Sequence, residues 1–435
     1  MIQKLLEKEL QLLKDCPLPR LSGRVTHVIG LLIESCGPDV FLGEICYIYG
    51  KQPTPIPCQV VGFKERKVLL MSLTDSFPIS AGAEVFPTGD EHRVAVGEAL
   101  CGRILDGLGR PIDGKGELMT EHFYPVMASP PPALSRCSIS KMLETQIKAV
   151  DALCALGQGQ RIGIFSGPGV GKSTLMGMVA RNAHADINVI ALIGERGREV
   201  REFIERELGA EGLARSVVIV ATSDQSALLR SKGANVAMAI AEFFRDQGKN
   251  VIVMMDSMTR YATALREIGL AVGEPPTTRG YTPSVFASLP KLLERAGNSD
   301  KGSITGIYTI LCEEDEAHDP IPDYMRSLLD GHIQLSRSLA AMHHFPPIDI
   351  LKSLSRSMLH ITDQQQQFWA AKIRSLLHSY AEAEELIHLG AYSSGSNPQV
   401  DEAIEKISKI QTFLKQEVSQ PISFEETRQR LRECL

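Results

Sequence analysis

The sequence predicts an α/β protein with a parallel sheet at its centre, a small β-barrel before it and a helical domain after it. Between residues 161 and 312, apolar strands alternate with helical patterns, which is typical of a parallel sheet covered by helices on both faces. Between residues 24 and 87, short β-branched and aromatic segments are separated by glycine, proline and charged turns, which favours a barrel. Beyond about residue 360 the apolar spacing is helical.

The first residues predict a short amphipathic helix. Its apolar side chains recur at helical spacing over residues 2–13, and prolines 17 and 19 end the segment. Such a helix either packs on the chain's own core or binds a partner, and the sequence leaves both open. A second proline-marked segment, residues 128–136, is interpreted as the linker before the central α/β part.

The composition predicts a soluble protein of two or three domains. With 435 residues, 43% of them hydrophobic and 23% charged, the chain can bury a large core. It has no run of about 18 apolar residues, which a membrane span needs. Its N-terminus alternates charged residues with leucine, unlike a signal peptide. We therefore expect the protein in the cytoplasm.

Cysteine spacing and net charge argue against several classes of protein. The nine cysteines show no C-x-x-C spacing, so neither a disulfide framework nor a zinc site is expected. The net charge of −6 gives no electrostatic footprint for nucleic acid. No nucleic-acid partner is expected on this count.

The stretch RIGIFSGPGVGKST, residues 161–174, joins an apolar strand, a glycine-rich turn and a helix start. A nucleoside triphosphate needs converging backbone N–H groups, a helix N-terminus and a nearby cation. Lys172 supplies the cation, and Ser173 can offer its hydroxyl to Mg²⁺. The predicted nucleotide-binding residues of this turn are Ser166, Gly167, Pro168, Gly169, Val170, Gly171, Lys172, Ser173 and Thr174.

Two residues of this turn depart from the strict pattern G-x-x-x-x-G-K-S/T. Ser166 stands where the pattern has glycine, and Pro168 contributes no N–H group. The important donors are therefore expected between Gly169 and Thr174.

Two carboxylates follow other buried strands and are candidates for hydrolysis. Asp256 ends the apolar run VIVMMD and can accept hydrogen bonds from Mg²⁺-bound water, although an aspartate here can also simply cap a helix. Glu195, in IGERGREVREF, can polarise the attacking water, and Arg196 can hold the geometry or contact phosphate. The other charged residues of that stretch are interpreted as a solvated helix start.

Six stretches together resemble the ATPases of bacterial type III protein export. That family serves flagellar assembly and virulence-associated injection, and it is similar to the catalytic subunit of rotary ATP synthases. The resemblance covers nearly the whole chain from about residue 20, and residues 267–297 are its most specific block. The stretches are SGPGVGKS, GERGREVREF, VIVMMDSMTRYA, EIGLAVGEPPTTRGYTPSVFASLPKLLERAG, LLDGHIQLSR and FPPIDILKSLSR.

The resemblance implies a three-part subunit with a RecA-like P-loop ATPase core. Residues 1–92 would form the N-terminal helix and β-barrel domain, 93–358 the ATPase domain and 359–435 the C-terminal helical domain. Six such subunits would form a homo-hexameric ring that binds ATP and Mg²⁺ at its interfaces.

The resemblance also implies residue roles. The family's catalytic glutamate falls on Glu195, its magnesium-site aspartate on Asp256 and its arginine finger on Arg356, with Lys172 in the phosphate cradle. Phe345 matches the aromatic position that stacks against adenine in related subunits, but it is equally compatible with a core aromatic.

The partners implied by the resemblance are those of an export motor. They are a stator-like regulator at the N-terminal helix, a central stalk protein, export chaperones, secreted protein substrates and a membrane export gate. The resemblance implies peripheral association with the inner-membrane export apparatus, where ATP hydrolysis would release cargo from chaperones.

Two other functions compete with the export motor. A non-catalytic or synthase-type ring subunit would also bind nucleotide, but the non-catalytic kind lacks the carboxylate that Glu195 supplies. An RNA-translocating ring also joins a small barrel to a RecA-like core. The acidic balance and the lack of clustered basic and aromatic positions in the barrel argue against it.

Overall fold

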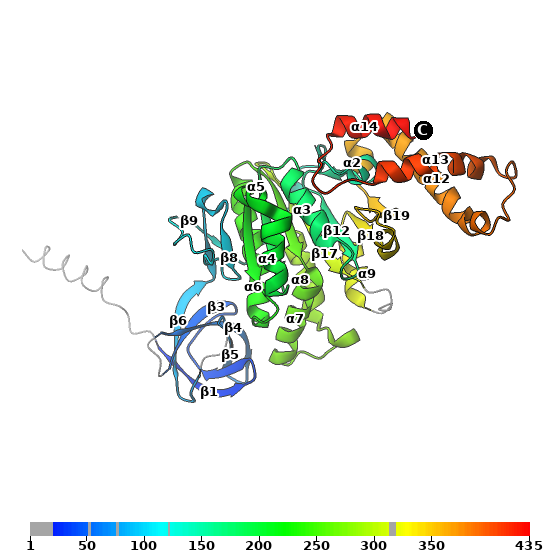
Figure 1. Ribbon diagram of the computed structural model, residues 1–435. Helices are drawn as coiled ribbons and strands as arrows, with labels where there is room; N and C mark the ends of the chain where they lie inside the picture. The colour runs from blue at the N-terminus through cyan, green and yellow to red at the C-terminus, as the bar shows by residue number, and fades with distance from the viewer. Residues whose placement is uncertain (1–20, 51–53, 75–77, 121, 313–318) are drawn as a thin grey trace, which may run out of the picture. The chain divides into compact units, whose positions relative to one another are not determined.

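The computed structural model describes residues 21–50, 54–74, 78–120, 122–312 and 319–435 (Figure 1). The predicted helix over residues 2–13 lies outside these residues. The chain divides into two compact units. Of the described residues, one unit holds those up to His92 together with 268–274, and the other holds those in 93–267 and 275–435. The predicted domain boundaries at 92 and 358 stay a prediction.

The predicted barrel is confirmed as six antiparallel strands that close on themselves in the order β1-β2-β5-β4-β3-β6. Side chains alternate along β3, where Cys46 and Ile48 are buried while Tyr47 and Tyr49 are exposed, as period-two strands require. The strands are β1 Gly23–Ile29, β2 Leu32–Cys36, β3 Glu44–Tyr49, β4 Ile56–Lys64, β5 Lys67–Ser72 and β6 Glu84–Glu91.

Short elements connect the barrel sequence to the central sheet. They are the antiparallel pair β7 Arg93–Val96 and β9 His122–Pro125, the turn η1 Glu98–Leu100 and strand β8 Ile104–Asp106. The predicted linker holds one short helical turn, η2 Ala133–Ser135. Strands β10 Met142–Leu143 and β11 Leu156–Gly157 then flank helix α2 Lys148–Leu153.

The central sheet confirms the predicted parallel architecture. Its order is β19-β18-β12-β17-β15-β13-β14-β8, and every neighbouring pair from β18 to β8 is parallel. Strand β19 is antiparallel to β18, and the short β16 Gly297–Asn298 is antiparallel to β17. The long strands are β12 Arg161–Ser166, β13 Ile187–Ile193, β14 Ser216–Ala221, β15 Asn250–Asp256, β17 Ser303–Leu311, β18 Gly331–Leu335 and β19 Ile348–Ser355.

Helices connect and follow these strands, as the alternating sequence pattern predicts. One difference concerns the stretch REVREFIEREL, residues 198–208, whose pattern favours a single helix. The structure instead has α4 Gly197–Glu202, a π-helical turn η3 Phe203–Leu208 and then α5 Gly209–Ala214. The others are α3 Lys172–Asn182, α6 Ala227–Asp246, α7 Met258–Val272, η4 Thr278–Gly280, α8 Pro283–Leu293, α9 Pro320–Leu328, α10 Arg337–Ala341 and α11 Met358–Ile361.

Each face of the central sheet packs into its own apolar core. In β13, Val189, Ala191 and Ile193 belong to one core together with α6, α7 and α8, whereas Ile190 and Leu192 belong to the other with α2 and α3. A strand buried on both faces explains why these segments are continuously apolar in the sequence. The carboxyl ends of the parallel strands therefore meet at one edge of a rigid sheet, where open α/β sheets bind ligands.

The C-terminal segment forms the predicted helices α12 Gln364–His388 and α13 Pro398–Leu414, followed by α14 Phe424–Glu433. Amide side chains join them to α2. Gln366 Nε2 donates to the Asp151 carbonyl at 2.8 Å, and Gln416 Oε1 accepts from the Lys148 N–H at 2.8 Å. Among the described residues, the search for a helix of membrane-spanning length and apolarity finds none.

Candidate active site

The predicted phosphate cradle is a tight turn between β12 and α3. Gly169 and Gly171 have φ angles of 74° and 113°, a region in which side chains other than glycine are strained. Gly171 directly precedes the first residue of α3, Lys172. The turn therefore presents a helix N-terminus at the carboxyl edge of the sheet, an arrangement suited to binding an anion.

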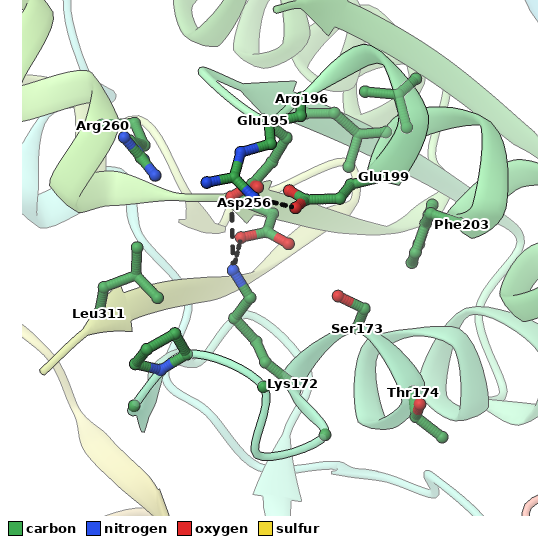
Figure 2. A pocket seen from close by; sticks show the side chains of 16 residues that line it. Lys172, Ser173, Thr174, Glu195, Arg196, Glu199, Phe203, Asp256, Arg260 and Leu311 are labelled. Carbon is green, nitrogen blue, oxygen red and sulfur yellow. Dashed lines mark hydrogen bonds and ion pairs between the residues drawn. The ribbon is translucent and has the colours of Figure 1, made fainter. Parts of the chain in front are cut away.

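A cavity of about 380 Å³ opens above this turn (Figure 2). Its wall combines the turn with residues from the ends of β13, β15 and β17 and from α4 and η3. The lining residues are Gly167, Pro168, Gly169, Gly171, Lys172, Ser173, Thr174, Leu192, Glu195, Arg196, Glu199, Val200, Phe203, Asp256, Arg260 and Leu311. Most of the residues that the sequence singled out are thus brought together in one cavity.

Lys172 reaches from the start of α3 to two carboxylates. Its Nζ forms a very short ion pair with Asp256 Oδ1 and lies 3.5 Å from Glu195 Oε1, as Figure 2 shows. Burial by itself would lower the pKa of Lys172, but the charges of Asp256 and Glu195 outweigh it and raise the pKa. The lysine is therefore a fixed cation at the centre of the cavity.

Asp256 is held by its strand and by a buried hydroxyl. It ends β15, and it pairs in register with Leu192 of the neighbouring β13. Thr309 Oγ1, on β17, donates a hydrogen bond to Asp256 Oδ1 at 2.8 Å. Strands on both sides therefore position this carboxylate opposite the lysine.

Glu195 follows β13 and is protonated more easily than an ordinary glutamate. Burial, then the nearby charge of Asp256, raises the pKa of Glu195 to about 7, although Lys172 opposes the shift. A carboxyl group with a pKa near neutrality can take up and release a proton at physiological pH. This matches the role expected of a base that orients or activates water.

Four predicted residues do not line the cavity. Ser166 ends β12, and its buried hydroxyl has no hydrogen-bond partner among the residues that the structure describes. Val170 is buried in the core of the face that packs on α3. Phe345 is 41% exposed, and Pro347, two residues after it, lies beside the cradle, 3.7 Å from a Cβ placed on Gly171. Arg356 follows β19 and is exposed, with its N–H bound to the Asp330 carbonyl at 3.0 Å.

The cavity also contains residues that the sequence reasoning missed or discounted. Glu199, interpreted as solvated, lies one helical turn after Glu195 and accepts a hydrogen bond from Arg196 at 3.3 Å. Arg260 adds a second arginine to the lining of the cavity, and the side chains of Phe203 and Leu311 form apolar parts of its wall. The available signal was position, because Arg260 lies in the first turn of α7, the helix that starts two residues after Asp256 ends its strand.

Comparisons with known proteins agree with this site. The chain is 52% identical to the flagellum-specific ATP synthase of Bacillus subtilis strain 168 over 93% of each chain. It is 48% identical to the type 3 secretion system ATPase of Xanthomonas euvesicatoria, over 98% of this chain and 96% of the relative. The chain belongs to the family of type III export ATPases. It is accordingly an ATPase of a type III protein export apparatus.

Domain models and a solved structure divide this export ATPase in the same way. Residues 25–89 match the β-barrel domain of the ATP synthase alpha/beta family, and 146–355 match its nucleotide-binding domain. Residues 362–433 match the T3SS EscN ATPase C-terminal domain. The assembled ATPase EscN of enteropathogenic E. coli, solved in complex with its central stalk EscO, is similar with a TM-score of 0.88. It is 44% identical, over 95% of this export ATPase and 99% of EscN.

Proposed function

We propose that this export ATPase hydrolyses ATP at a site that a neighbouring subunit of a ring completes. The observation that carries the proposal is the contact of Lys172 with Asp256 and Glu195 inside a cavity that Arg356 of the same chain does not line. Phosphoryl transfer gains several orders of magnitude in rate from an arginine that stabilises the developing charge. A second subunit is the natural source of that arginine.

The residues have distinct roles in the proposed reaction. The turn from Gly167 to Thr174 binds the phosphate oxygens through N–H groups, and Lys172 exchanges its carboxylate partners for the phosphates. Glu195 accepts a proton from the attacking water or orients it, which its pKa of about 7 permits near neutral pH. Arg196 and Phe345 are proposed to contact phosphate and adenine, respectively.

Mg²⁺ fits the donor groups of this site. The hydroxyl of Ser173 and the carboxylate of Asp256 are hard oxygen donors, the kind that Mg²⁺ prefers, and both line the cavity. Ser173 and Asp256 would hold the ion. When bound, it neutralises charge on the phosphate oxygens.

The larger assembly is proposed from the relatives. EscN is assembled in its solved structure and binds a central stalk, EscO, so a homo-hexamer with a stalk partner is proposed here. Chaperones, secreted substrates, a membrane export gate and a stator-like regulator are further proposed partners, at the inner-membrane export apparatus. Both flagellar and injection-type relatives lie near 50% identity, so identity alone favours neither machine.

Mixing two inactive variants tests the shared site directly. Glu195→Gln disables the cavity of its own subunit, and Arg356→Ala disables the finger it would present to a neighbour. If the site is shared, random co-assembly at equal amounts leaves about one interface in four with both groups intact, so activity returns to about a quarter of the wild-type value.

The measurement is phosphate release after the two purified variants are mixed and reassembled. Each variant alone is the matched control and is expected to be inactive. A mixture as inactive as its components would place Glu195 and Arg356 at the same subunit's site and overturn the proposal.

A further inference from the structure

A second cavity, of about 410 Å³, lies where α2 meets α13 and α14. These helices lie side by side in the same compact unit, as Figure 1 shows for α2 and α14. None of the residues assigned above to nucleotide binding lines it. The lining residues are Lys148, Ser408, Lys409, Thr412, Phe413, Arg430, Glu433 and Cys434.

Lys148 is a mostly buried cation that forms no ion pair among the described residues, and the carboxylate that acts on its charge, Glu426, is itself paired with Arg430. The residue is only 4% exposed, and among the described residues no carboxylate lies within ion-pair distance of its Nζ and no hydrogen bond from Nζ is present. Its neighbour is the ring of Phe413, whose centroid lies 5.5 Å from Nζ. Burial, and then the charge of Arg430, lowers the pKa of Lys148. Burying an ammonium group without a partner is costly, so the site favours an added anion.

The rest of the wall is rich in cations and hydrogen-bond donors. Lys409 and Arg430 add two further positive charges, and Ser408 adds a hydroxyl group, whereas the Thr412 hydroxyl already donates to the Ser408 carbonyl at 2.8 Å. Two carboxylates oppose them: Glu426 is paired with Arg430, and Glu433 lines the cavity while accepting from Gln429 at 3.1 Å. Three cations against two carboxylates leave the cavity net positive.

We propose that this cavity binds a phosphate group. A tetrahedral oxyanion can accept hydrogen bonds from an ammonium, a guanidinium and a hydroxyl group at once, and those are the donors present here. The phosphate would pair with Lys148 on α2 and with Lys409 and Arg430 on the C-terminal helices. It would thereby join the nucleotide-binding part of the chain to the helical part.

The position of α2 gives such binding a structural consequence. Gln416 accepts from the Lys148 N–H and donates to the Gln146 carbonyl at 2.8 Å, so the start of α2 is already joined to the C-terminal segment. A phosphate bound to Lys148 would add a second connection a few ångströms away. Occupancy is therefore expected to hold the C-terminal helices more firmly against the core.

Cys434 provides a local reporter for occupancy. Its side chain lines the cavity and is 5% exposed, so a bound phosphate limits access to the thiol. We measure alkylation of Cys434 by peptide mass spectrometry, with inorganic phosphate or with chloride at the same ionic strength. Phosphate is expected to slow the labelling about three- to tenfold at concentrations above its dissociation constant.

Variants separate this cavity from the nucleotide site. Lys172→Ala weakens phosphate binding in the cradle and should leave the protection of Cys434 unchanged. Lys148→Met keeps the side-chain length and the contact with Phe413 but removes the charge, so protection should disappear. Lys406→Met, on the same helix as Lys409 but outside the lining, is the matched control and should retain full protection.

Three results would overturn the proposal: equal labelling in phosphate and chloride, full protection in Lys148→Met, or loss of protection in Lys172→Ala. If Lys148→Met does not fold, the exposed Lys409→Met replaces it as the test variant. Lys409→Met should weaken the protection of Cys434 about threefold or more, and full protection in it would overturn the proposal. Phosphoserine in place of inorganic phosphate identifies the source of the group. Stronger protection by phosphoserine indicates a phosphate monoester, and stronger protection by inorganic phosphate indicates the free ion.

Discussion

Lys172 and Asp256 form an ion pair although 84 residues separate them in the chain. The lysine begins α3 and the aspartate ends β15, so the pair joins the phosphate cradle to the edge of the sheet. Because Glu195 lies within 3.5 Å of the same ammonium group, one cation holds together the two carboxylates proposed for metal binding and for catalysis.

Lys172→Ala is expected to lower kcat by about two to three orders of magnitude, because the phosphates lose their central cation. Steady-state phosphate release at saturating ATP measures the change. The exposed Lys291→Ala, on α8, is the control and should keep wild-type turnover. If Lys172→Ala hydrolysed ATP as fast as the wild type, the assignment of this turn as the phosphate-binding site would be wrong.

The rate of hydrolysis should depend on pH through Glu195. Its pKa is raised to about 7 in the nucleotide-free protein, and the ionised form is the base, so kcat/KM should rise about tenfold per pH unit below 7 and level off above it. A pH profile of kcat/KM tests this. Glu195→Gln should hydrolyse ATP only slowly, and its pH profile should lack the inflection near pH 7. If the inflection remained in this variant, it would belong to another titratable group.

Arg356→Ala should leave ATP binding by the single subunit largely intact while removing most of the hydrolysis. The reason is that Arg356 is exposed and does not line its own subunit's cavity. Binding of a fluorescent ATP analogue and phosphate release are measured on the same preparation. Turnover equal to that of the wild type would contradict the proposed finger.

Gly169→Ala should weaken nucleotide binding by about tenfold, because alanine at a φ of 74° costs about 1 kcal/mol or more and shifts the cradle. Gly390→Ala is a matched control, since Gly390 has a φ of 68° and likewise has nothing within 4 Å of an added Cβ. It should lose similar stability in thermal unfolding yet bind nucleotide normally. Equal affinity of both variants would show that the turn tolerates the strain.

Much of the fold and of the phosphate-binding turn could be predicted because the patterns that encode them lie in continuous stretches of sequence. The strand, turn and helix around Lys172 are encoded within 14 residues, and buried parallel strands are continuously apolar, so both were visible in the sequence. The π-helical turn at Phe203–Leu208 was not, because no local pattern marks where one residue is inserted into a helix. For the same reason Phe203 was missed as part of the cavity wall.

The sequence by itself determined the glycine-rich turn, its lysine and the alternation of strands and helices, because each depends on neighbours along the chain. Only the tertiary structure decided which distant groups meet that lysine. Strand order brings Glu195 after β13 beside Asp256 at the end of β15, and helix α7 carries Arg260 into the same cavity. It also left Arg356 outside, because β19 runs antiparallel to β18 and ends opposite Gly331, at the amino end of the parallel strands and away from the cradle.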